Sequence, residues 1–148
     1  MKTQFHHIVR GILIKDGKLL VAHYKGHHCF LPGGHIELGE SVENALIREW
    51  KEEIGTSCSI EKFLGVIENQ WRDGDTLHYE INHVFKVNSE QLKVETPPKS
   101  RESHLDFHWI APTEENLKRY NVMPESAVQI LMKKVQEHDI ETCWVSTL

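Results

Sequence analysis

Cysteine is scarce in this 148-residue sequence, and long apolar runs are absent from it. The cysteines, Cys29, Cys58 and Cys143, are an odd number, lie far apart and form no Cys-x-x-Cys pair. This argues against a disulfide framework or a structural zinc site, and it predicts a reducing, cytoplasmic location. No stretch approaches the roughly 18 apolar residues of a membrane span, and no apolar signal core begins the chain, so we expect no membrane partner.

Basic residues are outnumbered by acidic ones. The sequence has 17 Lys and Arg against 22 Asp and Glu, a formal net charge of −5. This balance argues against an extensive surface for nucleic-acid backbones, although it allows a local basic pocket. The hydrophobic fraction of 39% is typical of a globular protein, and the length suffices for one core. We therefore predict a single domain over residues 1–148.

Histidine, by contrast, is abundant. The eleven histidines are scattered and show no zinc-ligand spacing. We interpret them as surface and strand residues rather than as a metal cluster.

The most informative stretch joins a glycine-rich turn to an acidic helix, over residues 33–56. Adjacent glycines at its start are typical of positive φ or of a close backbone approach. Ser41 is a good N-cap and Gly55 a natural C-terminal stop, so the pattern predicts a helix between them.

Three carboxylates lie on one face of this predicted helix. Glu49, Glu52 and Glu53 have the spacing i, i+3 and i+4. Like charges at this spacing repel by roughly 0.2–0.5 kcal/mol per pair, and the dipole disfavours anions in the last turns by roughly 0.3–1 kcal/mol each. A solvated acidic face is the alternative for an isolated run. After a glycine turn, with Glu40 and Arg48 in place, we predict a site for Mg²⁺, with Mn²⁺ as a possible substitute.

The same stretch, Gly34 to Thr56, resembles the Nudix box of MutT-like Nudix hydrolases, Gly-x5-Glu-x7-Arg-Glu-U-x-Glu-Glu-x-Gly-U, where U is a bulky aliphatic residue. Its fixed positions are filled here by Gly34, Glu40, Arg48, Glu49, Glu52, Glu53 and Gly55. Trp50 and Thr56 depart from the hydrophobic positions, which affects packing rather than chemistry. The resemblance implies an α/β fold, the Nudix α/β/α sandwich with a mixed β-sheet.

The remaining elements are read from apolar periodicity and turn residues. We predict strands over 5–14 and 18–23, one or two strands over 57–70, a turn over 71–75, strands over 76–87 and 104–110, and helices over 112–117 and 124–137. The tail, 140–148, is expected to pack on the domain or on a second subunit, which leaves a homodimer open.

The resemblance also implies a reaction and roles. Water attacks one phosphorus of a pyrophosphate, and divalent ions neutralise the developing charge. Glu52 and Glu53 become the principal metal ligands, with the Gly33 carbonyl supplying another oxygen. Glu49 is a ligand or the general base, so the catalytic residues are expected to be Glu49, Glu53 and Arg48, the last as the residue that orients a carboxylate.

A further acid is expected from the polar loop 88–103. Related enzymes often draw an additional ligand or base from this region, shortly before a strand containing Trp. Glu102 is better placed than Glu95, because it directly precedes the predicted strand 104–110.

Candidate substrate contacts lie outside the box: Arg10, Lys25, Phe30, Trp71 and Glu80. Arg10 stands in an apolar run and either reaches solvent or meets a phosphate. The loop containing Lys25 is either solvated or contacts substrate. Glu80 shares a strand face with other polar residues, which is compatible with a cleft wall or with a solvent face.

Substrate identity is only weakly indicated. ADP-ribose-type relatives often carry Pro about fifteen residues past the box, and dinucleoside-polyphosphate types carry Tyr one position further, but Trp71 and Arg72 stand there. We therefore expect a small nucleotide substrate, a (deoxy)nucleoside triphosphate, with Trp71 or Phe30 stacking on the base. Alternatives are a nucleotide-sugar or ADP-ribose pyrophosphatase, an RNA 5′-end pyrophosphohydrolase, and a non-catalytic nucleotide-sensing module.

Overall fold

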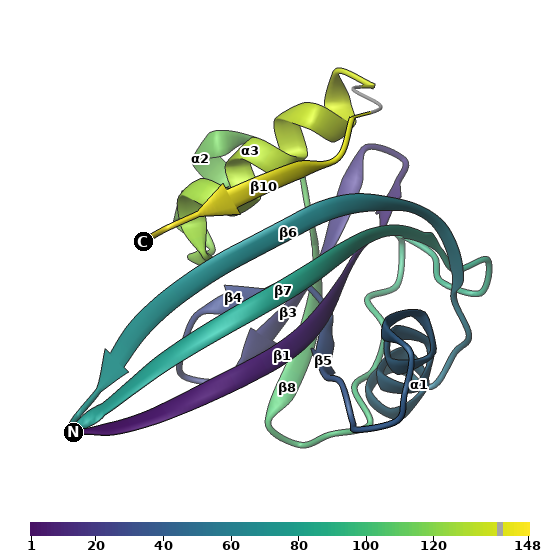
Figure 1. Ribbon diagram of the computed structural model, residues 1–148. Coiled ribbons are helices and arrows are strands. Elements are labelled where there is room, and N and C mark those ends of the chain that lie inside the picture. The colour runs from purple at the N-terminus through teal and green to yellow at the C-terminus, as the bar shows by residue number, and fades with distance from the viewer. Residues whose placement is uncertain (139–140) are drawn as a thin grey trace.

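The computed structural model describes residues 1–138 and 141–148 (Figure 1). Its strands are β1 (Lys2–Ile12), β2 (Ile14–Lys15), β3 (Lys18–Tyr24), β4 (Cys29–Phe30), β5 (Gly33–His35), β6 (Ser59–Asp73), β7 (Thr76–Asn88), β8 (Leu105–Ile110), β9 (Val122–Met123) and β10 (Cys143–Ser146). Its helices are α1 (Val42–Ile54), α2 (Glu114–Arg119) and α3 (Glu125–Gln136). Across the described residues, no helix combines the length and apolarity needed to cross a membrane.

The first sheet is mixed and has the strand order β10-β6-β7-β1-β5. The pairs β1–β7 and β10–β6 are parallel, whereas β6–β7 and β1–β5 are antiparallel. Helix α1 packs against β1 and β5, while α2 and α3 lie on the other side of the molecule (Figure 1). The predicted α/β/α sandwich with a mixed sheet is confirmed.

A second sheet was not predicted from the sequence. It has the order β2-β3-β4-β9, and β8 pairs antiparallel with β3. Asp16 and Gly17 form a hairpin turn between the predicted strands 5–14 and 18–23, but only β2 pairs with β3, because β1 belongs to the first sheet. The chain changes sheets near Leu13, which lies between β1 and β2 and is 1% exposed.

Two apolar cores hold the layers together. One joins α3 to both sheets through Val128, Leu131 and Met132. The other surrounds Trp50 of α1, whose side chain is 1% exposed. Trp50 replaces the aliphatic residue of the box pattern because Gly11 makes room for it, since a Cβ at Gly11 would lie 3.0 Å from the Trp50 ring.

The turn predicted over residues 71–75 is shorter in the structure. Trp71 and Asp73 belong to β6, and Asp73 pairs with Thr76 across a two-residue turn. Gly74 adopts φ 58° there, which suits a tight hairpin. Trp71 is therefore part of a paired strand, and the pairing fixes the direction of its side chain.

The C-terminal tail packs on its own domain. Strand β10 extends the first sheet beside β6, with Cys143 opposite Gly65. The approach is close, because a Cβ at Gly65 would lie 2.1 Å from the carbonyl oxygen of Cys143. Ile140, the first residue of the predicted tail, lies outside the described residues, and the expected homodimer stays a prediction.

Candidate active site

Helix α1 presents the box carboxylates, and local signals fix both of its ends. The Ser41 side chain accepts a hydrogen bond from the Asn44 N–H at 3.1 Å. Gly55 adopts φ 86° and donates to the Lys51 carbonyl. Both predicted caps are confirmed, so the carboxylates project from a helix with defined rotation and length.

Arg48 is the centre of an ionic network on α1. Its Nε and Nη2 donate to the two oxygens of Glu40 at 2.7 and 2.9 Å. Its Nη1 donates to Glu49 at 3.0 Å and to Glu52 at 3.2 Å. A further bond reaches the His35 carbonyl of β5 at 3.0 Å. These partners raise the pKa of the guanidinium, led by the Glu40 hydrogen bond. Arg48 is therefore placed to orient carboxylates.

The two glycines of β5 allow the chain to approach this network. A Cβ at Gly34 would lie 2.5 Å from the carboxyl carbon of Glu49. Gly33 has φ 150°, and a Cβ there would lie 2.0 Å from the Val9 carbonyl oxygen. Any side chain at Gly34 would thus displace Glu49, whereas Gly33 is favoured by its positive φ and its close approach to Val9.

Glu53 differs from the other carboxylates. Its residue is 7% exposed, and its Oε2 has no hydrogen-bond partner among the described residues. Burial, with the negative charges of Glu49 and Glu102, raises its pKa to about 8, whereas Arg10 acts in the opposite direction. Burial likewise raises the pKa of Glu49, although Arg48 opposes that rise.

These donors fit a hard divalent cation. Buried carboxylates are costly to ionise together without a compensating charge. A divalent ion would replace the proton on Glu53 and give Oε2 the partner that it lacks. Glu49, Glu52 and Glu53 are the residues that would hold Mg²⁺ or Mn²⁺. Glu52 would contribute from the rim, because its side chain is 53% exposed.

The loop before β8 brings Glu102 toward the same helix. The Arg101 N–H donates to the Glu53 carbonyl at 2.8 Å and ties this loop to the end of α1. Glu102 lies close enough to raise the pKa of Glu53, and its carboxylate pairs with His104 at 3.1 Å. Glu95 instead lines a separate hollow beside Lys15.

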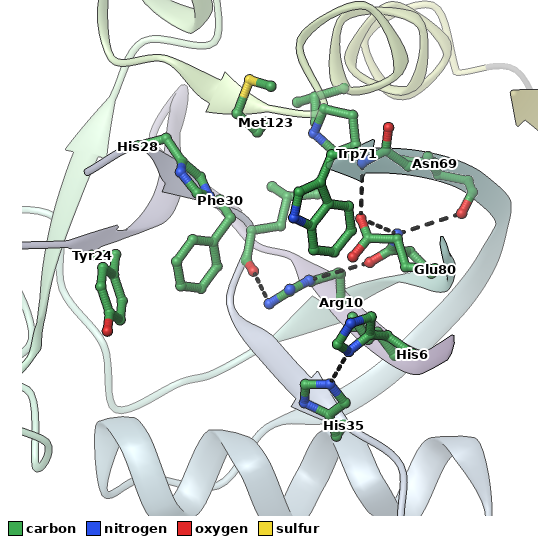
Figure 2. Close-up of a pocket in the computed structure, with 16 residues that line it drawn as sticks. His6, Arg10, Tyr24, His28, Phe30, His35, Asn69, Trp71, Glu80 and Met123 are labelled. Carbon is green, nitrogen blue, oxygen red and sulfur yellow. Dashed lines mark hydrogen bonds between the residues drawn. The ribbon is translucent and has the colours of Figure 1, made fainter. Parts of the chain in front are cut away.

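A cavity of about 800 Å³ opens beside β5 (Figure 2). Phe30 and Trp71 stand as aromatic walls around Arg10. The cavity is also lined by His6, Ile8, Tyr24, His28, Leu31, His35, Ile67, Asn69, Glu80, Asn82, Met123, Pro124 and Val128. An apolar cleft with a few convergent polar groups is typical of small-molecule sites.

Arg10 points into the cavity, which decides between the two orientations that the sequence allowed. Its guanidinium carbon lies 4.9 Å from the centre of the Phe30 ring. It donates to the Leu31 carbonyl at 3.1 Å and approaches Asn82 at 3.5 Å. Burial lowers its pKa, while Glu80, Glu53 and Glu49 raise it. Arg10 thus couples the cavity electrostatically to the carboxylates of α1.

The polar face of β7 forms a wall of this cavity rather than a solvent face. Glu80 is 8% exposed and accepts hydrogen bonds from Asn82 at 2.9 Å and Asn69 at 3.3 Å. Asn82 shares the strand face of Glu80, so it belongs to the polar face that the sequence allowed as a cleft wall. Asn69 was not predicted from the sequence as a lining residue. Asn69 comes from β6, and only sheet pairing brings it there.

Four of the five predicted substrate contacts line the cavity: Arg10, Phe30, Trp71 and Glu80. Lys25 does not belong to the described lining. It lies in the exposed turn after β3, where its N–H donates to the His104 carbonyl at 3.0 Å. Tyr24, at the end of β3, and His28, just before β4, line the cavity instead.

A ladder of histidines borders the cavity near β5. His6 bonds His35 through one ring nitrogen at 2.9 Å and His78 through the other at 2.8 Å. The Trp71 ring stacks on His78, with centroids 4.8 Å apart. Burial lowers the pKa of His6 and of His35, which favours their neutral forms. Because these imidazoles are neutral, Arg10 is the principal positive charge among the described residues that line the cavity.

The burial of Glu53 predicts a pH-dependent stability of the metal-free protein. Because its folded pKa is about 8 against an ordinary 4.5, stability present below 4.5 should be lost as the pH rises through 8. Glu53→Gln should therefore melt at a higher temperature than wild type at about pH 8.5, and near the wild-type temperature at about pH 5. Thermal melts in chelator measure this.

The matched control is Glu43→Gln, an exposed position on the same helix, which should leave the wild-type pH profile unchanged. A Glu53→Gln protein that melts below wild type at both pH values would contradict the prediction. The gain is expected to be largest at Glu53, because Arg48 partly offsets the effect of burial on Glu49.

Comparisons with known proteins agree with this arrangement. Residues 5–130 match the family described as NUDIX domain. An ADP-ribose pyrophosphatase of Methanocaldococcus jannaschii is 38% identical over 98 residues, covering 64% of this chain and 58% of that relative. A putative 8-oxo-dGTP diphosphatase, YtkD, of Bacillus subtilis is 25% identical over 122 residues, covering 82% of this chain and 75% of the relative. The crystal structure of a MutT NUDIX hydrolase from Burkholderia pseudomallei superposes with a TM-score of 0.62 at 21% identity, covering 89% of this chain and 98% of that one.

Proposed function

Because the chain belongs to the NUDIX domain family, we propose that it hydrolyses the pyrophosphate bond of a nucleoside diphosphate linked to another group, with Mg²⁺ or Mn²⁺. One observation carries the proposal. The unpartnered Oε2 of Glu53 lies in a buried acidic cluster, and that cluster is coupled through Arg10 to an aromatic cavity. A cation site beside a base-sized cavity is the arrangement that a nucleotide diphosphate requires.

The chain's own residues divide the work. Glu49, Glu52 and Glu53 would hold the cation, and the Gly33 carbonyl would add an oxygen. When bound, the ion neutralises phosphate charge and makes water more acidic. Arg48 keeps Glu49 and Glu52 in position through its bonds to both.

Two carboxylates are candidates for taking a proton from the attacking water. Glu49 is fixed between Arg48 and the β5 backbone, which suits a ligand. Glu102 comes from a loop and is anchored through His104 rather than through the Arg48 network, which suits a proton acceptor. Both lie near Glu53, so both stay in the proposed mechanism.

The cavity supports a nucleobase as the substrate's recognised end. Trp71 and Phe30 offer flat apolar surfaces, and stacking on aromatic side chains contributes roughly 1–3 kcal/mol per base. Glu80 accepts hydrogen bonds and Arg10 donates them, so both the donors and the acceptors on a base edge would find a partner. We propose a (deoxy)nucleoside triphosphate as substrate, and the similarity to a putative 8-oxo-dGTP diphosphatase supports this choice.

ADP-ribose is the second candidate, with nucleotide sugars of the same chemical class. It is favoured by the 38% identity to an enzyme named ADP-ribose pyrophosphatase, of which this chain covers 58%. The retained box carboxylates argue against a non-catalytic sensing module.

A substrate screen tests the proposal. Formation of the hydrolysis products, separated by chromatography and measured with Mg²⁺ and with Mn²⁺, should give the highest kcat/KM on a nucleoside triphosphate among NTPs, dNTPs, ADP-ribose, nucleotide sugars and dinucleoside polyphosphates. A higher value on ADP-ribose would transfer the assignment to the second candidate. Turnover of none of them, by folded protein with either ion, would contradict hydrolysis and favour the sensing module.

A further inference from the structure

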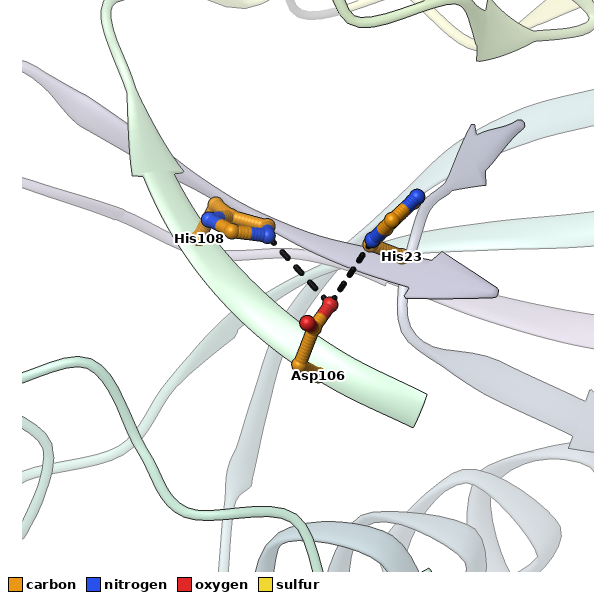
Figure 3. Close-up of side chains that lie close together, drawn as sticks. All are labelled: His23, Asp106 and His108. Carbon is orange, nitrogen blue, oxygen red and sulfur yellow. Dashed lines mark hydrogen bonds and ion pairs between the residues drawn. The ribbon is translucent and has the colours of Figure 1, made fainter. Parts of the chain in front are cut away.

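Two neighbouring strands of the second sheet bring three metal-ligating side chains together on one face (Figure 3). His23 lies on β3 directly opposite Asp106 of β8. His108 follows Asp106 by two residues and therefore projects from the same face of the strand. The sequence showed no zinc-ligand spacing because one ligand comes from a strand 83 residues before Asp106.

We propose that His23, Asp106 and His108 form a second metal site, distinct from the carboxylates of α1, for Zn²⁺ or a similar transition-metal ion. Their ligand atoms all lie within 4.8 Å of one another, and the described residues contain no other such group. The sequence analysis interpreted the histidines as scattered surface and strand residues; these two are the exception.

The distances match a metal site closely. His23 Nδ1 and His108 Nε2 lie 2.9 and 3.3 Å from the same oxygen, Oδ1 of Asp106. Zinc bonds of about 2.0–2.2 Å in a tetrahedron place the ligand atoms about 3.3–3.5 Å apart. The two nitrogen–oxygen separations are therefore close to those of a zinc site, and the two ring nitrogens lie within 4.8 Å of each other.

The donor set selects the kind of ion. Two imidazoles and a carboxylate suit zinc and neighbouring transition metals, whereas Mg²⁺ prefers oxygen ligands alone. The side chains are 30%, 44% and 42% exposed for His23, Asp106 and His108, so an ion can enter from solvent. Three protein ligands leave a fourth position of the tetrahedron for water.

The alternative is a metal-free hydrogen-bonded group. Oδ1 of Asp106 then accepts a hydrogen bond from each imidazole N–H, and the three side chains only support the pairing of β3 with β8. The three ligand atoms nevertheless lie within 4.8 Å of one another on one face of the sheet, which would let them surround one ion. Metal affinity separates the two interpretations.

The site's position suggests what bound metal would do. His23 is followed by Tyr24, which lines the cavity, and Asp106 follows the loop that carries Glu102. An ion shared by these two strands would join their ends at the point where both lead into the proposed active site. It would stabilise the fold by mass action, since an ion that binds only the folded state raises its melting temperature.

Calorimetric titration of Zn²⁺ into the full chain, in excess Mg²⁺ to saturate the α1 carboxylates, tests the proposal. Wild type should bind about one equivalent. Losing an outer-shell partner of a metal typically weakens affinity roughly 10–100-fold, so His108→Ala and His23→Ala should each weaken it at least that much. His27→Ala is the matched control, an exposed histidine outside the group that should bind like wild type.

Co²⁺ provides a second readout, because its visible absorption reports tetrahedral nitrogen ligation. The spectrum should appear with wild type and with His27→Ala and be lost in His108→Ala. If an alanine variant fails to fold, Asp106→Asn and His108→Gln take its place. Wild-type zinc affinity in folded His23 and His108 variants, equal weakening by His27→Ala, or no binding at all would overturn the proposal. None of these outcomes depends on hydrolytic activity, so they leave the proposed function untouched.

Discussion

Glu53→Gln should lower kcat by roughly a hundred- to a thousandfold or more while leaving the fold intact. Loss of a single electrostatic group at a transition state commonly costs this much, and Glu53 has the buried, unpartnered oxygen of the cluster. The amide keeps the size of the side chain but cannot balance a cation's charge. Steady-state kinetics on the best substrate of the screen measures the effect.

Two controls make this result specific. Glu43→Gln carries the same substitution on an exposed part of α1 and should keep wild-type kcat. Circular dichroism and thermal melts of Glu53→Gln establish that it is folded, and its melting temperature is expected to be equal or higher. Near-normal turnover by the folded variant would remove Glu53 from the proposed catalytic site.

Removal of divalent ions should abolish hydrolysis. Charge neutralisation by a metal contributes several kcal/mol to phosphoryl-transfer transition states, so excess chelator should reduce the rate by about a hundredfold or more. Added Mg²⁺ should restore it, and Mn²⁺ should substitute. Initial rates in titrated free Mg²⁺ provide the measurement.

The control for this experiment is chelator already saturated with Mg²⁺, which should not inhibit. Restoration by Mg²⁺ alone, with no added Zn²⁺, would assign the requirement to the α1 carboxylates rather than to His23, Asp106 and His108. Undiminished turnover in excess chelator would contradict the metal-dependent mechanism.

Local signals explain why the helix and the charged positions of the box could be predicted from the sequence. Helix caps act over three or four residues, so Ser41 and Gly55 defined α1 before any tertiary contact was known. The spacing of Glu49 and Glu53 along a helix then set their common face. Part of the ionic role of Arg48 followed from the same helical geometry, because Glu52 lies four residues away on one helix face, whereas Glu40 precedes the helix.

Long-range strand pairing explains why the lining of the cavity could not be predicted from the sequence. The direction of Arg10 depends on where Phe30 and Asn82 come to lie, and they are 20 and 72 residues away in the chain. The polar row beginning at Glu80 became a cavity wall only when β6, β1 and α3 closed around it.

The sequence by itself indicated the reaction class, because one turn and one helix resemble the Nudix box and residue spacing within such short elements fixes their geometry. The tertiary structure decided the shape of the cavity, the burial of Glu53 and the meeting of His23 with Asp106. Each depends on segments that approach only after the two sheets pair, and no local pattern encodes the register of that pairing.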